Sequence, residues 1–218
     1  MYDGIIFDKD GVLLDSGINN FTWMDKVKSE TAERLGHELT VEDSYKLVHA
    51  ETVGEVDELL QEKGMSWDDL REIEDNVQDK KKELIRYGII QLFPQVKKIL
   101  NSIEQEKALV SNAPQDVTHY TLEYFEIRKH FSKVNAPSLA KPKKYIEIKK
   151  PQPTMIEDVI DNLGFENPLM IGDTSADIKA AKKAGIDSVH VNSYDTDMEV
   201  EPTYRVPRVE NILEIVKK

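Results

Sequence analysis

The chain has 218 residues, no cysteine and a formal charge of −12, from 41 acidic and 29 basic residues. This length suits one large domain, or a core domain with a smaller insert. The missing cysteines exclude disulfides, thiolate metal sites and a cysteine nucleophile, and the acidic balance argues against nucleic acid as a general partner. No apolar run approaches ~18 residues, so no membrane span is expected. The early first strand leaves no room for a signal peptide, and we expect a cytoplasmic protein.

The first predicted element is a buried strand, Gly4 to Phe7, which ends in Asp8 and Asp10. Carboxylates at the exit of a buried strand are costly to desolvate, and they occur where a metal, a cation or a reaction compensates them. A simple turn of Asp and Gly residues explains the same pattern. Lys9 is expected to point away from the site, because side chains alternate along a strand.

Residues 16–88 have helical periodicity, many charges and no convincing strand. They predict an α-helical insert that directly follows the first strand. Within it, residues 68–86 are expected to form a long exposed helix. Trp23 and Trp67 are expected to pack in a core rather than to stack on a ligand.

After the insert, short β-branched runs alternate with helical patterns, which predicts a parallel sheet covered on both faces. The predicted strands are 108–110, 133–136, 169–171 and 188–191, and the predicted helices are 95–103, 116–125, 154–163 and 177–184. Residues 136–153, rich in lysine and proline, are expected to form an irregular connection. The fold class is therefore α/β, a Rossmann-like doubly wound core of residues 1–15 and 89–218 with a helical domain of residues 16–88.

Polar side chains follow two more of these strands. Ser111 and Asn112 follow strand 108–110, at the edge of a parallel sheet where ligands bind. They could donate hydrogen bonds to an anion, or cap the next helix. Asp173 and Asp177 follow strand 169–171, and Asp177 alone could be a helix cap.

A lysine precedes a predicted helix in the segment Lys150-Pro151-Gln152-Pro153. Pro153 suits the first turn of a helix, and a lysine held beside it could neutralise a phosphate. An ordinary solvated lysine is the alternative. Lys141, which also precedes a proline, is a rival with the same local sequence.

The ends of parallel strands meet at one edge of a sheet. Four carboxylates would gather there, those of Asp8, Asp10, Asp173 and Asp177. Two carboxylates ~4 Å apart repel by roughly 4 kcal/mol at an effective dielectric of 20, so we expect a cation among them. Oxygen ligands without thiolates favour Mg²⁺. With a lysine and a Ser-Asn pair beside it, this group predicts a site that binds phosphoryl groups.

These four clusters resemble the ordered motifs of the haloacid dehalogenase (HAD) superfamily over nearly the whole chain. The motifs are Asp8-Lys9-Asp10-Gly11, Ser111-Asn112, Lys150-Pro151 and Gly172-Asp173-…-Asp177. The distance to Gly172-Asp173 favours Lys150 over Lys141 as the lysine of the family. The helical insert resembles the C1 cap of subfamily I, and the pattern is similar to phosphoglycolate-phosphatase-like and β-phosphoglucomutase-like proteins. One departure is Gln95 after Phe93-Pro94, where this group usually has glycine.

The resemblance implies a role for each motif residue. Asp8 would be the nucleophile that takes the phosphoryl group as an aspartyl-phosphate. Asp10 would protonate the leaving alcohol and then activate water, and its backbone carbonyl would help to bind Mg²⁺. Ser111 and Asn112 would hold the phosphoryl oxygens, and Lys150 would balance charge on the nucleophile and the phosphate. Mg²⁺ would be held by the acidic motif residues, Asp8, Asp10, Asp173 and Asp177.

The expected activity is Mg²⁺-dependent hydrolysis of a small phosphorylated metabolite, with neither nucleic acid nor membrane as a partner. Halide displacement is not expected, because dehalogenase members lack the Mg²⁺-site acids and the second aspartate of the first motif. Asn19, Asn20 and Trp23 are the expected substrate contacts of the cap. Hinges for its opening are expected near residues 15–17 and 87–92.

Three alternatives stay open at this stage. A phosphosugar mutase would carry a cap histidine near Asn20, and the sequence has none there. A phosphonatase needs a Schiff-base lysine from the cap, for which Lys26 or Lys28 qualifies by position. A non-catalytic binding protein on the same fold is suggested by the charge-rich insert, but no catalytic position is lost.

Overall fold

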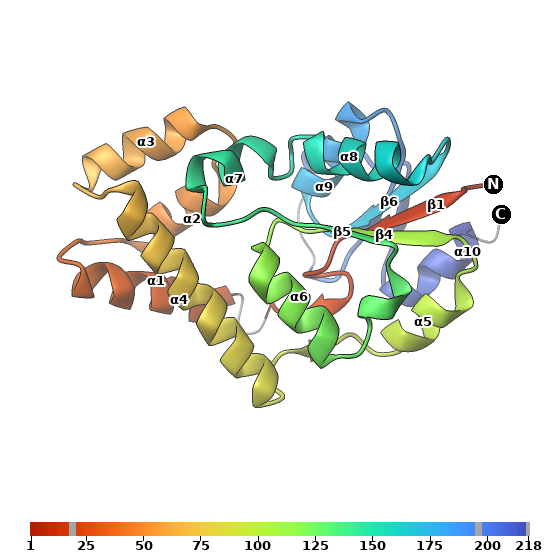
Figure 1. Ribbon diagram of the computed structural model, residues 1–218, viewed down its shortest axis with the longest axis horizontal. Coiled ribbons are helices and arrows are strands. Elements are labelled where there is room, and N and C mark those ends of the chain that lie inside the picture. The colour runs from red at the N-terminus through yellow and green to blue at the C-terminus, as the bar shows by residue number, and fades with distance from the viewer. Residues whose placement is uncertain (18–20, 195–197, 217–218) are drawn as a thin grey trace.

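A six-stranded parallel sheet forms the centre of the computed structural model, which describes residues 1–17, 21–194 and 198–216 (Figure 1). The strand order is β5-β4-β1-β6-β7-β8. The strands are β1 (Gly4–Phe7), β4 (Glu106–Val110), β5 (Lys133–Asn135), β6 (Pro168–Gly172), β7 (Asp187–Val191) and β8 (Tyr204–Val206). The chain builds outward from β1 in both directions, so β1 lies where the strand order reverses. Ligands bind at such a point, outside the carboxyl ends of the strands.

Helices cover both faces of this sheet, as the alternation of strands and helices predicted. They are α5 (Val96–Ser102), α6 (Gln115–Tyr124), α8 (Thr154–Leu163), α9 (Ser175–Lys183) and α10 (Leu213–Val216), with 3-10 turns η2 (Arg128–His130) and η3 (Val209–Ile212). One further helix, α7 (Pro142–Ile148), packs against the insert instead. Side chains alternate between the faces along β1. Ile5 and Phe7 belong to the apolar cluster shared with α5 and η3, and Ile6 belongs to the cluster shared with α8 and α9.

The helical insert lies between two short strands, β2 (Leu14–Asp15) and β3 (Gln91–Leu92), which pair antiparallel. Its helices are α1 (Thr22–Arg34), α2 (Val41–His49), α3 (Val53–Glu62) and α4 (Trp67–Arg86). Capping boxes begin α2, α3 and α4, with Thr or Ser before an acidic third residue. The insert also has an apolar cluster of its own, which includes Leu59, Leu70 and Ile73.

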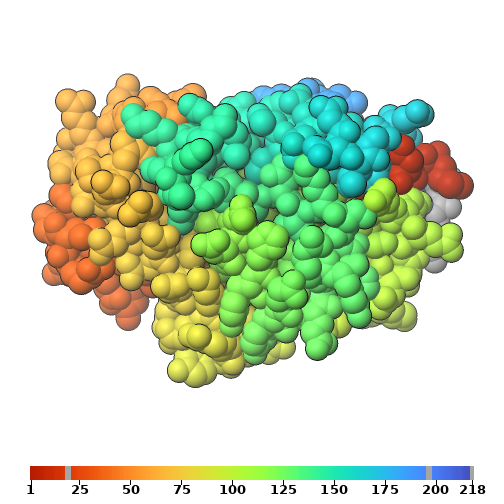
Figure 2. All heavy atoms as spheres, in the orientation of Figure 1, coloured from red at the N-terminus to blue at the C-terminus, as the bar shows by residue number. Residues whose placement is uncertain are grey.

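Two expectations about helices need correction. Helix α4 is amphipathic rather than exposed along its length, and it buries Ile73 and Val77. The segment 136–153 is not wholly irregular, because it contains α7, with Pro142 in its first turn. Ile146 of α7 is buried in the apolar cluster of the insert, and α7 lies beside α3 in the space-filling view (Figure 2).

The residue before α5 shows why glycine is usual there in the proteins that this chain resembles. Gln95 has φ of +66°, a left-handed conformation that glycine adopts easily and other residues rarely do. Its side chain is exposed, so this backbone conformation is not imposed by side-chain packing in the core. No helix in the described part of the chain is long and apolar enough to cross a bilayer.

Candidate active site

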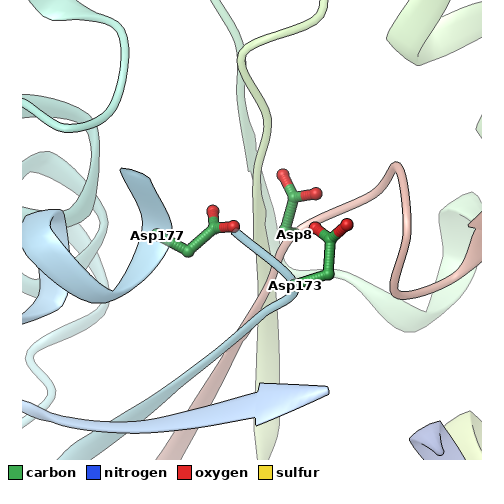
Figure 3. A group of neighbouring side chains, drawn as sticks. All are labelled: Asp8, Asp173 and Asp177. Atoms are coloured by element: carbon green, nitrogen blue, oxygen red, sulfur yellow. The ribbon is translucent and has the colours of Figure 1, made fainter. Parts of the chain in front are cut away.

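Three buried carboxylates meet at the carboxyl edge of the sheet (Figure 3). Asp8 follows β1, Asp173 follows β6, and Asp177 lies in the first turn of α9. One oxygen from each carboxylate lies within 4.8 Å of the others. The structure therefore brings together three of the four acids that the motifs supply.

Two glycines make this close approach possible. Gly11 has φ of +82°, and a Cβ atom there would lie 1.9 Å from Oδ2 of Asp173. A Cβ atom on Gly172 would lie 2.2 Å from the Cβ of Asp177. Larger residues would push both acids away from Asp8, so the glycines of these two motifs have a steric purpose.

Asp177 serves the helix and the site at once. Its Oδ2 accepts hydrogen bonds from the backbone N–H of Thr174 (3.0 Å) and from the Thr174 hydroxyl (2.7 Å), which completes a capping box. Its Oδ1 lies 2.5 Å from Nζ of Lys150. Asp177 is therefore a helix cap, as one explanation predicted, and it also lies among the buried acids, where its role in binding a metal stays a prediction.

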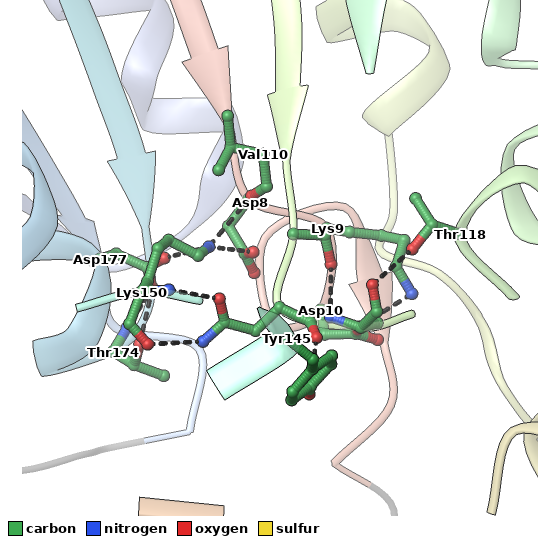
Figure 4. Close-up of polar contacts among 12 residues, drawn as sticks. Asp8, Lys9, Asp10, Val110, Thr118, Tyr145, Lys150, Thr174 and Asp177 are labelled. Carbon is green, nitrogen blue, oxygen red and sulfur yellow. Dashed lines mark hydrogen bonds and ion pairs between the residues drawn. The ribbon is translucent and has the colours of Figure 1, made fainter. Parts of the chain in front are cut away.

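Lys150 lies between two of the carboxylates (Figure 4). Its Nζ is 2.5 Å from Oδ1 of Asp8 and 3.0 Å from the carbonyl oxygen of Val110. Burial alone would lower the pKa of Lys150, but Asp177 and Asp8 outweigh burial and raise it. Lys141, the rival lysine, is exposed at the start of α7.

Ser111 and Asn112 do not cap α6. The residue before α6 is Pro114, and no side chain caps that helix. Asn112 instead clamps the backbone of Lys150: its Nδ2 donates to the Lys150 carbonyl (2.8 Å), and its Oδ1 accepts from the Lys150 N–H (2.7 Å). The Ser111 hydroxyl accepts from the N–H of Ala113 (3.1 Å) and lines the cavity, so its hydrogen can point to a ligand.

Asp10 stands apart from the other acids, because two lysines hold its carboxylate. Nζ of Lys81 lies 2.5 Å from Oδ1, and Nζ of Lys9 lies 2.8 Å from Oδ2. Burial raises the pKa of Asp10, but Lys81 and Lys9 outweigh it and bring the pKa below its usual range. Lys9 does not line the cavity, as expected, but its ammonium is not directed away from the site as a whole, because it contacts the carboxylate of Asp10.

Lys81 comes from α4 of the insert, and the sequence analysis missed it. A signal was available, because Val77, Lys81 and Leu84 share one helical face and the other two are apolar. A lysine on the buried face of a helix is expected to have a partner. Here the partner is the proposed acid-base residue, 71 positions away in the chain.

Lys150 offsets only part of the cost of burying the other carboxylates. Burial is the largest cause that raises the pKa of Asp8, to about 7, and the pKa of Asp173 is raised well above its ordinary value, mainly by burial and then by Asp177. Three oxygen donors without a thiol or an imidazole fit a hard divalent cation such as Mg²⁺. Such an ion would hold all three acids in the ionised form.

A cavity of about 290 Å³ joins this group to the insert. Trp23 and Trp67 both line it, although they were expected in a core. Both also pack against apolar clusters, Trp23 against that of Leu14 and Ile85 and Trp67 against that of the insert. The Nε1 of Trp23 donates to the carbonyl of Ser16 (3.4 Å). The other expected substrate contacts, Asn19 and Asn20, lie outside the described residues.

Lys28 also lines the cavity, from α1. Its Nζ lies 3.1 Å from Oε1 of Glu74, and an ammonium held by a carboxylate is a poor imine-forming amine. This ion pair argues against a phosphonatase that would use Lys28.

Comparison with known proteins places the chain in a family, in agreement with the group of carboxylates described above. The sequence model described as haloacid dehalogenase-like hydrolase matches residues 5–191. The chain belongs to this family. It is therefore a hydrolase of the HAD superfamily, and the matched region extends from β1 to the end of β7. Among curated proteins, none is significantly similar to the chain.

Solved structures show the same fold along the whole chain. A predicted phosphoglycolate phosphatase from Haemophilus somnus is 21% identical, with a TM-score of 0.72 over 98% of this chain and 97% of that one. CbbY from Rhodobacter sphaeroides, solved with phosphate, is 16% identical, with a TM-score of 0.76 over 97% and 96%. A candidate β-phosphoglucomutase from Thermotoga maritima is 21% identical, with a TM-score of 0.63 over 99% and 98%.

Proposed function

We propose that this HAD hydrolase is a Mg²⁺-dependent phosphatase that acts on a small phosphomonoester through an aspartyl-phosphate. The observation that carries the proposal is the position of Asp8. Its buried carboxylate lies 2.5 Å from Lys150, shares a group with Asp173 and Asp177, and opens into the cavity. The phosphate in the CbbY structure of similar fold supports the same class of ligand.

The first step is attack of an Asp8 carboxylate oxygen on phosphorus, and the bond from phosphorus to the leaving oxygen breaks. Asp10 gives a proton to that oxygen, so that an alcohol leaves. Lys150 stabilises negative charge on Asp8 and on the phosphoryl oxygens, and the Ser111 hydroxyl donates to one of them. The divalent cation, held by Asp8, Asp173 and Asp177 when bound, reduces repulsion between the anionic nucleophile and the anionic substrate.

The second step returns the enzyme to its initial state. Water attacks phosphorus, the bond between Asp8 and phosphorus breaks, and Asp10 accepts the proton of the water. The ion pairs with Lys81 and Lys9 favour the ionised form of Asp10, which suits this base role. In the first step the same low proton affinity helps the protonated carboxyl to give its proton to the leaving oxygen. The insert acts as a cap, since the position of α4 sets the position of Lys81 and therefore the charge around Asp10.

A phosphate-release screen over phosphorylated metabolites tests the proposed function directly. We expect release from at least one small phosphomonoester with Mg²⁺ present, and loss of that release after chelation of divalent metal, because three buried carboxylates lose the ion that compensates them. Activity that survives complete chelation would contradict the metal-dependent mechanism. No release from any substrate, together with a stoichiometric protein partner, would favour a binding protein instead.

Lys81→Met should move the acidic limb of the pH–rate profile to higher pH. Lys81 favours the ionised form of Asp10, so its removal raises the pKa of Asp10, and the base form is lost at a higher pH. We expect a shift of about one unit or more, because the two groups are in direct contact. The measurement is kcat against pH for the wild type and the variant.

Lys80→Met is the matched control for this experiment. Lys80 is the neighbouring residue on α4, and its ammonium pairs with Glu83 at the surface. Its loss should leave the acidic limb where it is. If the acidic limb lay at the same pH in Lys81→Met as in Lys80→Met, Lys81 would not lower the pKa of Asp10.

A further inference from the structure

Lys149 is a buried lysine that the proposed mechanism does not use. It follows α7, precedes Lys150, and is only 4% exposed. It lines the same cavity as Asp8. Its Nζ donates to the carbonyl oxygen of Val48 in α2 (3.1 Å), whereas an ammonium group has three hydrogens to donate.

The ammonium of Lys149 has no carboxylate in direct contact among the described residues. No carboxylate of the described residues lies within 4.0 Å of its Nζ, and the acid with the largest electrostatic effect on it, Glu74, is paired with Lys28 (3.1 Å). Burial lowers the pKa of Lys149 to about 8. Glu74, Glu55 and Glu51 act on Lys149 only from a distance, and its Nζ lies 5.9 Å from the ring centre of Tyr145. Buried lysines are usually paired, and here the direct anionic partner is missing among the described residues.

The ammonium of Lys149 contrasts with the mainly apolar lining of the cavity on the side of the insert. The insert lines the cavity mainly with apolar side chains, among them Val56, Trp67 and Leu70. Apolar walls with a few placed polar groups are typical of small-molecule sites, in which the polar groups fix the orientation of the ligand. A substrate whose phosphoryl group lies at Asp8 would place its alcohol portion in this space.

We propose that Lys149 binds a second anionic group on the substrate, a carboxylate or a second phosphate on the alcohol portion. The inference rests on the proposed phosphatase function and narrows its substrate class. In this arrangement Lys150 faces the transferred phosphoryl group, and Lys149 binds the second anionic group, on the alcohol portion of the substrate. The bound anion completes the ion pair that the protein itself does not provide.

Three series of synthetic phosphates of matched chain length test this inference. They are plain alkyl phosphates, ω-carboxyalkyl phosphates and alkane α,ω-bisphosphates. For the wild type we expect kcat/KM to be about tenfold or more higher for an anionic series than for the alkyl phosphates, as one charge-assisted hydrogen bond provides. The better of the two anionic series identifies the second group as a carboxylate or a phosphate.

Lys149→Met should remove this preference and change kcat/KM for the alkyl phosphates less than about threefold, because they never contact the ammonium. Lys149→Gln keeps a donor for the Val48 carbonyl without the charge, and it should lose the preference too. Lys144→Met is the control on α7, since Lys144 is exposed and pairs with Glu147. It should keep the preference of the wild type.

The outcomes separate this inference from the proposed function. Hydrolysis of the alkyl phosphates at the same kcat/KM as the anionic series would overturn the role of Lys149 and leave the phosphatase standing. A preference that survives in both Lys149 variants, or an equal fall on all three series, would also overturn it. No phosphate release from any series, alkyl phosphates included, would overturn the proposed function and this inference with it.

Discussion

Asp8→Asn is expected to abolish phosphate release and to leave the fold intact. Asparagine has the shape of aspartate, but its amide cannot attack phosphorus or form an acyl phosphate. Loss of the nucleophile in a group that acts as a unit lowers turnover by a factor on the order of 10⁴ or more. The measurement is single-turnover phosphate release by the variant at saturating Mg²⁺.

The same substitution should not destabilise the metal-free protein. Burial and the carboxylate of Asp177 raise the pKa of Asp8 to about 7, although Lys150 opposes them. The folded state therefore holds this proton more tightly than the unfolded state, whose carboxyl has a pKa near 4. Metal-free stability consequently falls as pH rises through that interval, and Asp8→Asn removes this contribution. We expect its melting temperature at pH 8 without metal to equal or exceed that of the wild type.

Two comparisons make the result of Asp8→Asn decisive. Asp161→Asn changes an exposed aspartate of α8 and should keep full activity. Acid quench of the wild type during turnover of radiolabelled substrate should leave label on the protein that mild alkali releases, and Asp8→Asn should carry none. Near-normal turnover of Asp8→Asn would show that Asp8 is not the nucleophile.

The sequence predicted the parallel core well, because buried strands such as β1, β4 and β6 are short apolar runs between helical patterns. The sequence did not predict elements that are stabilised by contacts with distant parts of the chain. Helix α7 has only one turn of apolar spacing, and it is stabilised by Ile146 in the cluster of the insert. Strand β8 is three residues long and completes the sheet edge beside β7.

Apart from Lys150, the motif residues could be placed at one edge from the sequence, because each follows a strand end of a parallel sheet, while their roles come from the resemblance to the family. Lys81 and Lys149 could not be assigned in this way. Their roles depend on how α4 and α7 pack across the cavity, which brings Lys81 to Asp10 and Lys149 to Val48. The apolar helical face around Lys81 signals that its ammonium is buried but does not name its partner, and the residues next to Lys149 give no such signal.

Lys150→Met is the second substitution with a large expected effect, and it should impair both activity and stability. In the wild type one ammonium lies 2.5 Å from Oδ1 of Asp8 and 2.5 Å from Oδ1 of Asp177. Removal of one partner from a buried ion pair typically costs about 3–5 kcal/mol, because the other charge is left without compensation. Turnover should fall by a factor on the order of 10³, since the charge that stabilises the phosphoryl oxygens is lost as well.

The pH dependence of stability distinguishes this effect from a general folding defect, because loss of Lys150 should change the stability in a defined direction with pH. Lys150 lowers the pKa of Asp8, so in Lys150→Met the folded-state pKa of Asp8 rises further above its unfolded value. Stability should then increase as pH falls and should be lost as pH rises through the new pKa. Chemical unfolding without metal at pH 5 and pH 8 measures the difference, which should be larger in the variant than in the wild type.

Lys141→Met is the control that the chain itself offers. Lys141 has the same Lys-Pro sequence, but its side chain is exposed and makes no ion pair with any described residue. It should match the wild type in turnover, in unfolding free energy and in the pH dependence of stability. If Lys150→Met and Lys141→Met had equal turnover and equal unfolding free energy, the buried ammonium of Lys150 would neither favour the ionised form of Asp8 nor stabilise the carboxyl edge of the sheet. A loss confined to Lys150→Met would show that one lysine meets both requirements, because the charge that keeps Asp8 ionised also keeps the buried acids together.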